Sequence, residues 1–331
     1  MKAKKFLPII ALALAATTLT ACGDKSVTFG HYWFTDSLTK VENFYEEATY
    51  DVTSESFTNN YVNYKVSFDG TFTTTFEYNH TEGFYEFATK LDVKATYELG
   101  DSTTTVDDYA ESWVKFDAKG NALRPIESSK KMLCHTPLSG EFKTVEQCYA
   151  TVDYEYATKY SSDTNKGTIQ STKCNVTNNE GKTTESILND TFSFVKDHTF
   201  IDNEQLLVAI RAFSEDASSA TLGSYSAFAK NTQKIKLSFS NAEDNATETF
   251  SYNLIDANGN ETPKQLNHLC RTAKISLDQE NPGVTQTVKF VKAESPSNNT
   301  YRNLILEMTT PLSYSMGEIY YKLKSVSYKK P

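Results

Sequence analysis

Apolar and polar residues alternate with a period of two along most of this chain. The clearest run covers residues 91–99, where every second residue is apolar and those between are charged or hydroxylated. Such alternation is typical of a strand with one face on a core and one face in water. The pattern recurs at residues 62–68, 152–156, 235–239, 273–277, 304–308 and 319–323. Because parallel strands buried on both faces form continuous apolar runs instead, we expect an all-β, mainly antiparallel fold.

Turn residues separate these runs at residues 118–121, 178–181 and 256–260, where we expect hairpin tips. The pair Asp69-Gly70 differs, because the apolar residues keep even numbers on both sides of it. A two-residue hairpin would send Phe72 and Phe76 to the wrong face. Either a three-residue loop pairs Phe68 with Phe72, or one long strand bends at Gly70. Long, bent strands predict a curled sheet or half-barrel.

Two segments carry the three- and four-residue spacing of helices, and we expect one or two short helices that cover the sheet. The first is residues 36–48. The second begins at Asp202, whose relation to Gln205 resembles a capping box, and has an apolar face within residues 206–213.

Residues 214–226 are rich in small and hydroxyl side chains and are the best linker candidate. They would separate a β-rich lobe with flanking helices, residues 36–213, from a C-terminal β-rich lobe, residues 227–331. The alternative is that both lobes form one continuous domain.

The chain begins with a short basic segment and an uncharged stretch, residues 6–20, that is too short to span a bilayer. The following Leu19-Thr20-Ala21-Cys22 resembles the lipobox of bacterial lipoprotein precursors. The resemblance implies that the signal peptide, residues 1–21, is removed and that Cys22 carries a diacylglyceryl group and often an acylated amino group. Residues 22–35 would then form a lipidated N-terminus and short tether on the extracytoplasmic face of the cell membrane. An ordinary secretory signal cleaved near Ala21 is the alternative.

Removal of the leader takes away three lysines, so the formal net charge changes from −9 to about −12. An acidic body is repelled by phosphates, which excludes nucleic acid as an expected partner and keeps the protein off anionic headgroups. The lipid on Cys22 is therefore the only membrane anchor that we expect.

Four further cysteines follow Cys22. Cys134 ends one strand-like run and Cys148 opens the next, so a disulfide across the loop between them is a candidate. Free, buried thiols are the alternative, because a chain of this length does not need a disulfide. No two cysteines lie within four residues of each other and the five histidines are scattered, so no metal site is expected.

Sequence motifs for catalysis or cofactor binding are missing: there is no nucleophile elbow, phosphate loop, dinucleotide fingerprint or zinc-protease motif. Ser128 and Lys131 match Ser-x-x-Lys, but the companion motifs of that enzyme class are missing. The adjacent acids Asp107 and Asp108, and His135 with its neighbouring cysteine, should point to opposite faces of a strand. We therefore predict no catalytic residue and no cofactor.

The chain contains 20 Phe and 20 Tyr but only two tryptophans, Trp33 and Trp113. The cluster His31-Tyr32-Trp33-Phe34 could rest at the headgroup level, line an apolar cavity or pack in the core. Runs at residues 112–117, 123–128, 204–213 and 316–323 resemble those of β-rich envelope lipoproteins of unknown function and of half-barrel lipoproteins that carry lipidated molecules. That resemblance transfers no ligand residue to this chain.

The one-sided strands, the aromatic residues and the short tether lead to the hypothesis of a non-enzymatic, membrane-anchored protein that binds a lipid or another apolar ligand. A structural or surface-interaction module that binds an envelope polymer or protein is the alternative. A hydrolase with an unrecognised site is the third hypothesis.

Overall fold

The computed structural model describes residues 29, 44–56, 61–118, 122–213, 217–240, 247–278, 285–292, 303–312 and 315–329. Cys22, the predicted signal peptide and the cluster around Trp33 lie outside these residues, as do residues 36–43 of the first predicted helix. The described chain is mostly strand with one short α-helix, which confirms the all-β fold class. No helix among the described residues is long and apolar enough to cross a membrane.

Sixteen strands of the described chain belong to one sheet. The first nine are β1 (Tyr45–Ser56), β2 (Lys65–Asn79), β3 (Phe84–Leu99), β4 (Ser102–Asp117), β5 (Arg124–Pro137), β6 (Tyr149–Ser161), β7 (Lys166–Thr177), β8 (Thr183–Glu185) and β9 (Asn189–Ser193). The others are β10 (Ser219–Ser226), β11 (Asn231–Phe239), β12 (Thr247–Ile255), β13 (Glu261–Leu277), β14 (Gln286–Val291), β15 (Ile305–Pro311) and β16 (Gly317–Ser327). Helical residues form the 3₁₀ turns η3 (Val145–Cys148) and η4 (Asn203–Gln205) and the helix α2 (Leu206–Arg211).

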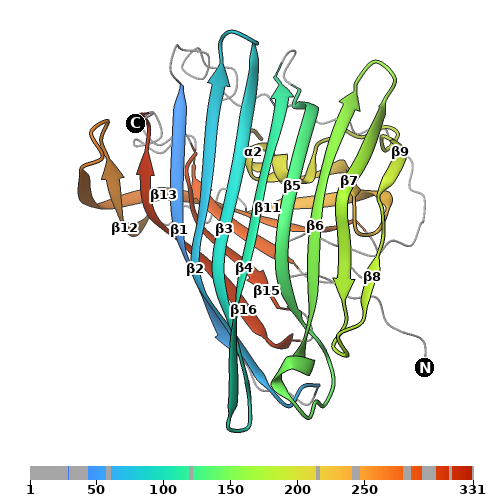
Figure 1. Cartoon of the computed structure of the whole chain (residues 1–331). Coiled ribbons are helices and arrows are strands. Elements are labelled where there is room, and N and C mark those ends of the chain that lie inside the picture. The colour runs from blue at the N-terminus through green and yellow to red at the C-terminus, as the bar shows by residue number, and fades with distance from the viewer. Residues whose placement is uncertain are drawn as a thin grey trace.

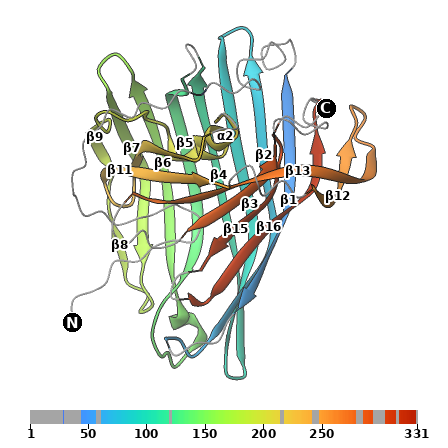
Figure 2. The ribbon, with the colours of Figure 1, turned by 180° about the vertical axis from the view of Figure 1, so that it is seen from behind.

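Strands β1 to β7 pair in chain order, and every one of these pairings is antiparallel. They form a broad layer of long strands, which we call the wall (Figure 1). β1 also pairs with β16, from which the sheet continues through β15, β14, β13 and β11 to β10. This second layer crosses the back of the wall, and in Figure 2, which is seen from behind, it lies in front of the wall. The sheet therefore folds back over itself and encloses the core between its two layers.

The second layer contains a small closed barrel. β13 pairs with β12 through its first half and with β11 and β14 through its second half. β12 also makes a short parallel pairing with β16, through Asn253–Ser325 to Ile255–Ser327. The pairings thus return to their start through β12, β13, β14, β15 and β16, and the remaining strands are added to this barrel. The curling predicted from the long strands is confirmed and goes further than a half-barrel.

β2 continues without interruption through Gly70, so the structure has the second of the two predicted alternatives, one long strand, and not a three-residue loop. Gly70 lies opposite Val52 of β1 and Val93 of β3. A Cβ atom at this position would clash with the carbonyl oxygen of Asp92 and with Val93. The close approach of β3 therefore requires glycine here.

Aromatic side chains fill the inner face of the wall. The ring of Phe76 stacks on Tyr85 and on Phe116, with centroid separations of 5.5 and 6.0 Å, and all three side chains are fully buried. Tyr50 of β1 donates a hydrogen bond of 3.1 Å to the carbonyl of Ile305, which ties the wall to the second layer. Much of the aromatic content of the chain therefore lies in the core.

The predicted helix after Asp202 is confirmed, including its capping box. The Asp202 carboxylate accepts the amide N–H of Glu204 at 2.7 Å, and the Asp202 amide donates to the Gln205 side chain at 3.2 Å. α2 follows directly and lies on the side of the wall that the second layer covers (Figures 1 and 2). Its side chains are buried nearly all round, so it is part of the core.

The last residue of α2 joins the helix to the wall. Arg211 forms a bidentate ion pair with Glu46 of β1, at 2.7 and 2.9 Å, and both side chains are almost completely buried. Its carbonyl accepts the side-chain amide of Asn303 at 3.1 Å. The pair therefore connects the helix, β1 and the residues before β15.

Two secondary-structure predictions are wrong. Residues 45–48, assigned to the first helix, belong to β1, because backbone pairing with β2 and β16 overrides the local helical spacing. Residues 219–226, assigned to a linker, form β10. Their small side chains permit close packing, since a Cβ atom on Gly223 would approach Val195 to 2.8 Å.

All four cysteines of the described chain are buried, free thiols. Cys134 lies opposite Val152 in the β5–β6 ladder, whereas Cys148 lies four residues before Val152. Four residues of strand span about 13 Å, well beyond the separation of about 7 Å between Cα atoms that a disulfide tolerates. The structure therefore does not join the candidate pair Cys134–Cys148.

Candidate functional site

The two ends of the sheet meet along a line that we call the seam, formed by β9, β10 and the connecting residues 194–205. Phe192 of β9 stacks on Tyr225 of β10, with ring centroids 4.0 Å apart and planes inclined by 12°. Phe200 packs on Phe192 and forms a backbone bridge with Gly223. Side chains rather than a continuous hydrogen-bonded ladder therefore join the described ends of the sheet.

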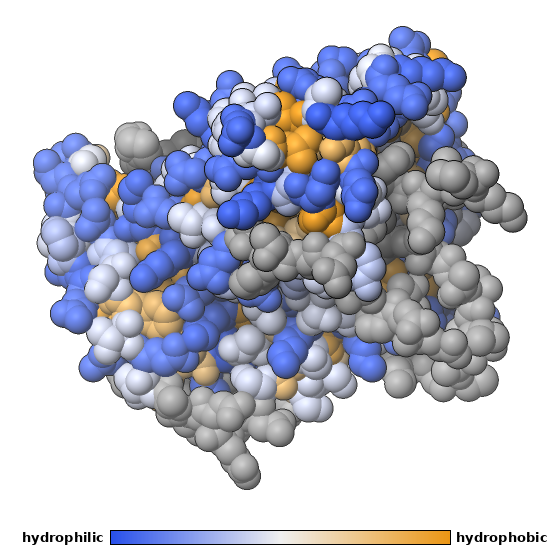
Figure 3. Space-filling model, turned by 90° about the horizontal axis from the view of Figure 1, so that it is seen from below, coloured by the Kyte–Doolittle hydropathy of each residue, from blue (hydrophilic) through white to orange (hydrophobic). Residues whose placement is uncertain are grey.

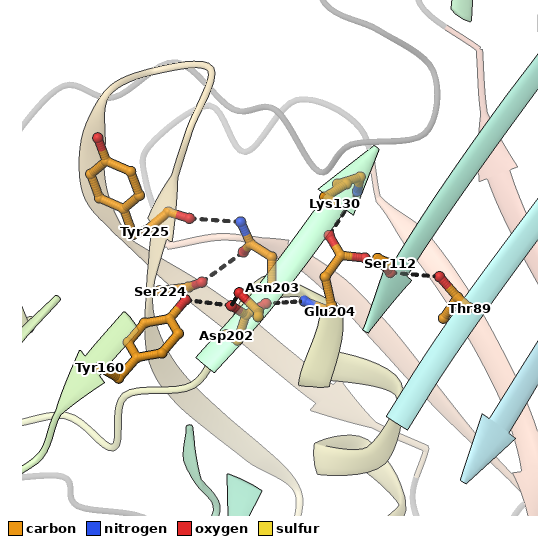
Figure 4. A network of polar contacts seen from close by, with 10 residues as sticks. Thr89, Ser112, Lys130, Tyr160, Asp202, Asn203, Glu204, Ser224 and Tyr225 are labelled. Carbon is orange, nitrogen blue, oxygen red and sulfur yellow. Dashed lines mark hydrogen bonds and ion pairs between the residues drawn. The ribbon is translucent and has the colours of Figure 1, made fainter. Parts of the chain in front are cut away.

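A buried carboxylate, Asp202, lies beside the seam. One of its oxygens caps η4, as described above. The other accepts the hydroxyl of Ser128 on β5 at 2.6 Å. It also accepts the hydroxyl of Tyr160 on β6 (Figure 4). Asp202 is 5% exposed, so these donors replace the water that the carboxylate loses. The contacts fasten the connecting segment to the wall.

Burial shifts the titration of this group. Desolvation raises the pKa of Asp202, and the nearby charge of Glu204 acts in the same direction, while the hydrogen bonds from Ser128 and Tyr160 oppose both. Burial also raises the pKa of the Tyr160 hydroxyl well above its usual range, and Asp202 adds to this shift. Tyr160 therefore stays a protonated donor to Asp202 at neutral pH.

Glu204 makes the second connection to the wall. Its Oε1 pairs with the Lys130 ammonium at 2.7 Å, and its Oε2 accepts the hydroxyl of Ser112 at 2.8 Å (Figure 4). The Ser112 and Thr89 hydroxyl oxygens are 2.7 Å apart, so the chain of hydrogen bonds reaches β3. Lys130 is buried, and Glu204 compensates its charge.

Asn203, between these two acids, points to the other end of the sheet. Its side-chain N–H donates to the Tyr225 carbonyl at 2.7 Å, and its side-chain oxygen accepts the Ser224 hydroxyl at 2.7 Å (Figure 4). We call Asp202, Asn203 and Glu204 with these partners the clasp. Three consecutive side chains thus join β10 to β4, β5 and β6.

A small pocket lies beside the clasp. Its walls include Ser128, Lys130, Tyr156, Tyr160, Asp202 and Glu204. It has room for about one water molecule. Although a serine hydroxyl beside a carboxylate can serve as a nucleophile with its base, Ser128 is only 3% exposed. The geometry therefore suits a structural role, in which the clasp holds the segment before α2 on the wall beside a space for about one water molecule.

The structure also tests the Ser-x-x-Lys match at Ser128 and Lys131. The two side chains do not meet, because Lys131 belongs to the outer face, where its amine lies 5.9 Å from the centre of the Tyr109 ring. Lys130 shares the inner face with Ser128 instead. The sequence motif therefore does not form a site. The two residues that line the pocket together are Ser128 and Lys130, which are two positions apart and not three.

The sequence did not indicate that Asp108 and His135 meet, but their side chains are in contact in the structure. The Asp108 carboxylate is 2.6 Å from the His135 Nδ1 and accepts the His135 backbone N–H at 3.0 Å. The β4–β5 ladder ends at the pair Tyr109–Leu133, and the carboxylate accepts the amide of His135 two residues beyond that end. Burial raises the pKa of Asp108, and the contacts with His135 act against that shift. The pair closes the end of this ladder.

The buried thiols are held in their protonated form. Burial raises the pKa of Cys148 to about 11, with a smaller contribution from Glu146, and it raises the pKa of Cys134 further. Because the thiolate is the reactive form, neither cysteine is activated as a nucleophile. Within the described residues, no group of three or more His, Cys, Asp or Glu side chains is placed to hold a metal ion.

No family model matches the chain, and no curated protein matches its sequence. Among solved structures, the chain is similar to a β-barrel-like protein of the domain of unknown function DUF1849 from Brucella abortus, with a TM-score of 0.49 and 9% identity. The match covers 88% of this chain and 100% of that chain.

Proposed function

We propose that this protein is a lipid-anchored, non-enzymatic binding protein on the extracytoplasmic face of the bacterial cell membrane. It binds an envelope polymer or a protein partner through the outer face of the wall. One observation carries this proposal: the outer face presents a regular row of alternating charges. Its members are direct ladder partners on β3 to β7, namely Lys90, Glu111, Lys131, Glu155 and Lys173.

A second row crosses the same face closer to the end of the strands. Glu86, Lys115, Glu127 and Lys159 are ladder partners on β3, β4, β5 and β6, and Lys115 pairs with Glu127 at 3.1 Å. Opposite charges directly across a ladder stabilise strand pairing, by roughly 0.2–1 kcal/mol for each pair. They also make this face nearly neutral within a Debye length, although the chain as a whole is acidic. A mixed-charge or acidic partner is therefore not repelled here.

The packing of the inner face favours a partner that binds at the outer surface over an apolar ligand that binds in the interior. In the described chain its aromatic side chains pack on one another, as in the Tyr85–Phe116 stack with centroids 5.5 Å apart. The pocket beside the clasp is polar and has the size of one water molecule. These observations favour the hypothesis of a surface-interaction module.

A non-enzymatic role is supported by the partners of the buried charged groups. Asp202 accepts three hydrogen bonds, and Glu204 compensates Lys130. Each carboxylate thus holds two parts of the fold together. These groups therefore stabilise the fold, and the outer face binds the partner.

The lipid anchor at Cys22 is supported by the short distance between it and the fold. Phe29 is fully buried and packs edge-on against Phe213, with ring centroids 5.1 Å apart. Phe29 lies seven positions after Cys22, and these seven steps of chain span at most about 25 Å. A lipid at Cys22 would therefore hold the wall close to the membrane.

The test is a capture experiment with the purified mature protein and an envelope extract. The bound fraction is analysed by mass spectrometry for protein and polymer, and an organic extract of the purified protein is analysed for lipid. We expect a macromolecular component and no stoichiometric lipid besides that on Cys22. Stoichiometric extractable lipid without a macromolecular component would overturn the surface-binding proposal.

A further inference from the structure

Apolar side chains gather on the outer face of the wall at one end of β3, β4 and β5. Phe84 opens β3 and Trp113 lies near the end of β4. Ile126 is the extra residue of a β-bulge in β5, between the pairs Lys115–Glu127 and Phe116–Pro125. Ile126 is 40% exposed, and both aromatic rings are partly exposed. The Lys115 amine lies 5.0 Å from the centre of the Phe84 ring and 5.3 Å from that of Trp113. We call these four residues the aromatic patch.

The composition of the aromatic patch suits the interface between a bilayer and water. Tryptophan is enriched at the level of lipid headgroups, where one side of the ring is apolar and the N–H finds polar partners. A lysine covers apolar surface with its stem while its ammonium stays among polar groups. Lys115 does this here, because its amine lies over both rings and pairs with Glu127.

The aromatic patch lies across the sheet from the clasp, and contacts through α2 link the clasp to Phe29, where the described chain begins. Trp113 follows Ser112, which on the opposite face of the sheet bonds to Glu204 beside α2. Phe213, two residues beyond α2, packs on Phe29. The anchor therefore lies within about 25 Å of a residue packed beside α2.

The other end of the wall is farther away. From Ser112, β4 continues for ten residues to Ser102 at the β3–β4 hairpin, a distance of about 33 Å. Tyr61 also lies at that end, because its carbonyl accepts the amide of Gly140, beyond the end of β5. Seen from that end, hydrophilic residues cover most of the described surface, and apolar residues appear in separate patches (Figure 3).

We infer that the aromatic patch rests on the phospholipid bilayer and that the β3–β4 hairpin points away from it. This inference rests on the proposed anchor at Cys22. The acids Glu86 and Glu127 flank the patch, so we expect contact with zwitterionic headgroups rather than anionic ones. In this orientation Glu86, Lys115 and Glu127 of the second row face the headgroups. The row from Lys90 to Lys173 lies farther from the bilayer, so partner binding falls to that row.

The test measures the depth of one tryptophan in the lipidated full-length protein, bound to vesicles of phosphatidylcholine and phosphatidylethanolamine. Trp33→Phe leaves Trp113 as the single tryptophan. The matched control combines Trp33→Phe, Trp113→Phe and Tyr61→Trp, which moves the reporter to an exposed position at the far end. Both proteins are titrated into vesicles that contain brominated phosphatidylcholine, and circular dichroism confirms that both are folded.

We expect bromolipid to quench most of the Trp113 emission and to leave the emission of the control unchanged. Equal quenching of both reporters, or stronger quenching of the control, would overturn the orientation. The mass of the N-terminal peptide is measured on the same samples. A lipidated Cys22 with unquenched Trp113 contradicts this inference alone, whereas a Cys22 without lipid contradicts the proposed anchor as well.

Discussion

The carboxylate of Asp202 accepts the hydroxyl of Ser128 at 2.6 Å across 74 positions of the sequence, and both side chains are buried. This contact joins the segment before α2 to the middle of the wall. With Asn203 and Glu204 it connects the two ends of a sheet that would otherwise meet mainly through stacked aromatic rings. Closure at the seam therefore depends on a few side chains together with the backbone bridge between Phe200 and Gly223.

Removal of the Asp202 carboxylate should destabilise the protein. Asp202→Ala removes a helix cap and leaves the Ser128 and Tyr160 hydroxyls without their acceptor, and we expect a loss of about 2–4 kcal/mol in the free energy of unfolding. Urea denaturation followed by circular dichroism measures this loss. Asp92→Ala, at an exposed position on β3, is the control and should change stability by less than about 0.5 kcal/mol. Equal effects of the two substitutions would contradict the role of the clasp.

The stability of the protein should depend on pH through Asp202. Because the pKa of this group is raised in the folded state, its contribution is fully present below the unfolded pKa, near 4, and is lost as pH rises through the folded pKa. Wild type should therefore gain stability relative to Asp202→Asn when the pH falls from 7 to 4. Urea midpoints of both proteins at the two pH values measure this difference, and Asp108 contributes equally to both. A difference that is independent of pH would argue against a raised pKa.

The Glu46–Arg211 pair should behave as a coupled unit. Arg211→Met leaves Glu46 as an uncompensated buried charge and should cost about 3–5 kcal/mol. The double variant Glu46→Leu with Arg211→Met removes both charges and should recover much of that loss. A double-mutant cycle by chemical denaturation gives the coupling energy. Strictly additive effects would show that the two side chains do not depend on each other.

Gly70 should tolerate no side chain. A methyl group there meets the backbone of β3, so Gly70→Ala should destabilise the protein by about 1–3 kcal/mol or more. Gly181→Ala is the matched control: φ is +76° and no atom lies within 4 Å, so only backbone strain of about 1–2 kcal/mol is expected. Thermal unfolding of the two variants separates clash from strain. A larger loss for Gly181→Ala would contradict the close approach of β3.

Local patterns predicted the strands and the cap at Asp202, and at Gly70 they excluded a two-residue hairpin and left one long strand as one of two alternatives. Each of these depends on residues that are close in sequence, because strand alternation and capping act within a few positions. The same local spacing failed at residues 45–48, where β2 and β16 supply hydrogen bonds on both sides. Pairing with β2 and β16 therefore determined the structure of residues 45–48, which the local pattern did not.

The clasp and the buried ion pair could not be predicted from the sequence. Glu46 and Arg211 are 165 residues apart, and Glu204 is 74 residues from Lys130. Nothing in the spacing of these residues indicates that they meet, because the contact exists only after the sheet has folded back over itself. Asp202 was recognised as a cap, but its bonds to Ser128 and Tyr160 depend on the position of β5 and β6.

Binding through the outer face of the wall is the central claim, and a charge-reversal experiment tests it most directly. Glu111→Lys with Glu155→Lys makes the row on β3 to β7 uniformly basic, while Glu55→Lys with Glu318→Lys makes the same change in net charge on β1 and β16. Affinity for the captured envelope component is measured for both double variants. We expect the first to lose most of its binding and the second to bind like wild type. Wild-type affinity in the first variant, with its fold intact, would contradict the proposal.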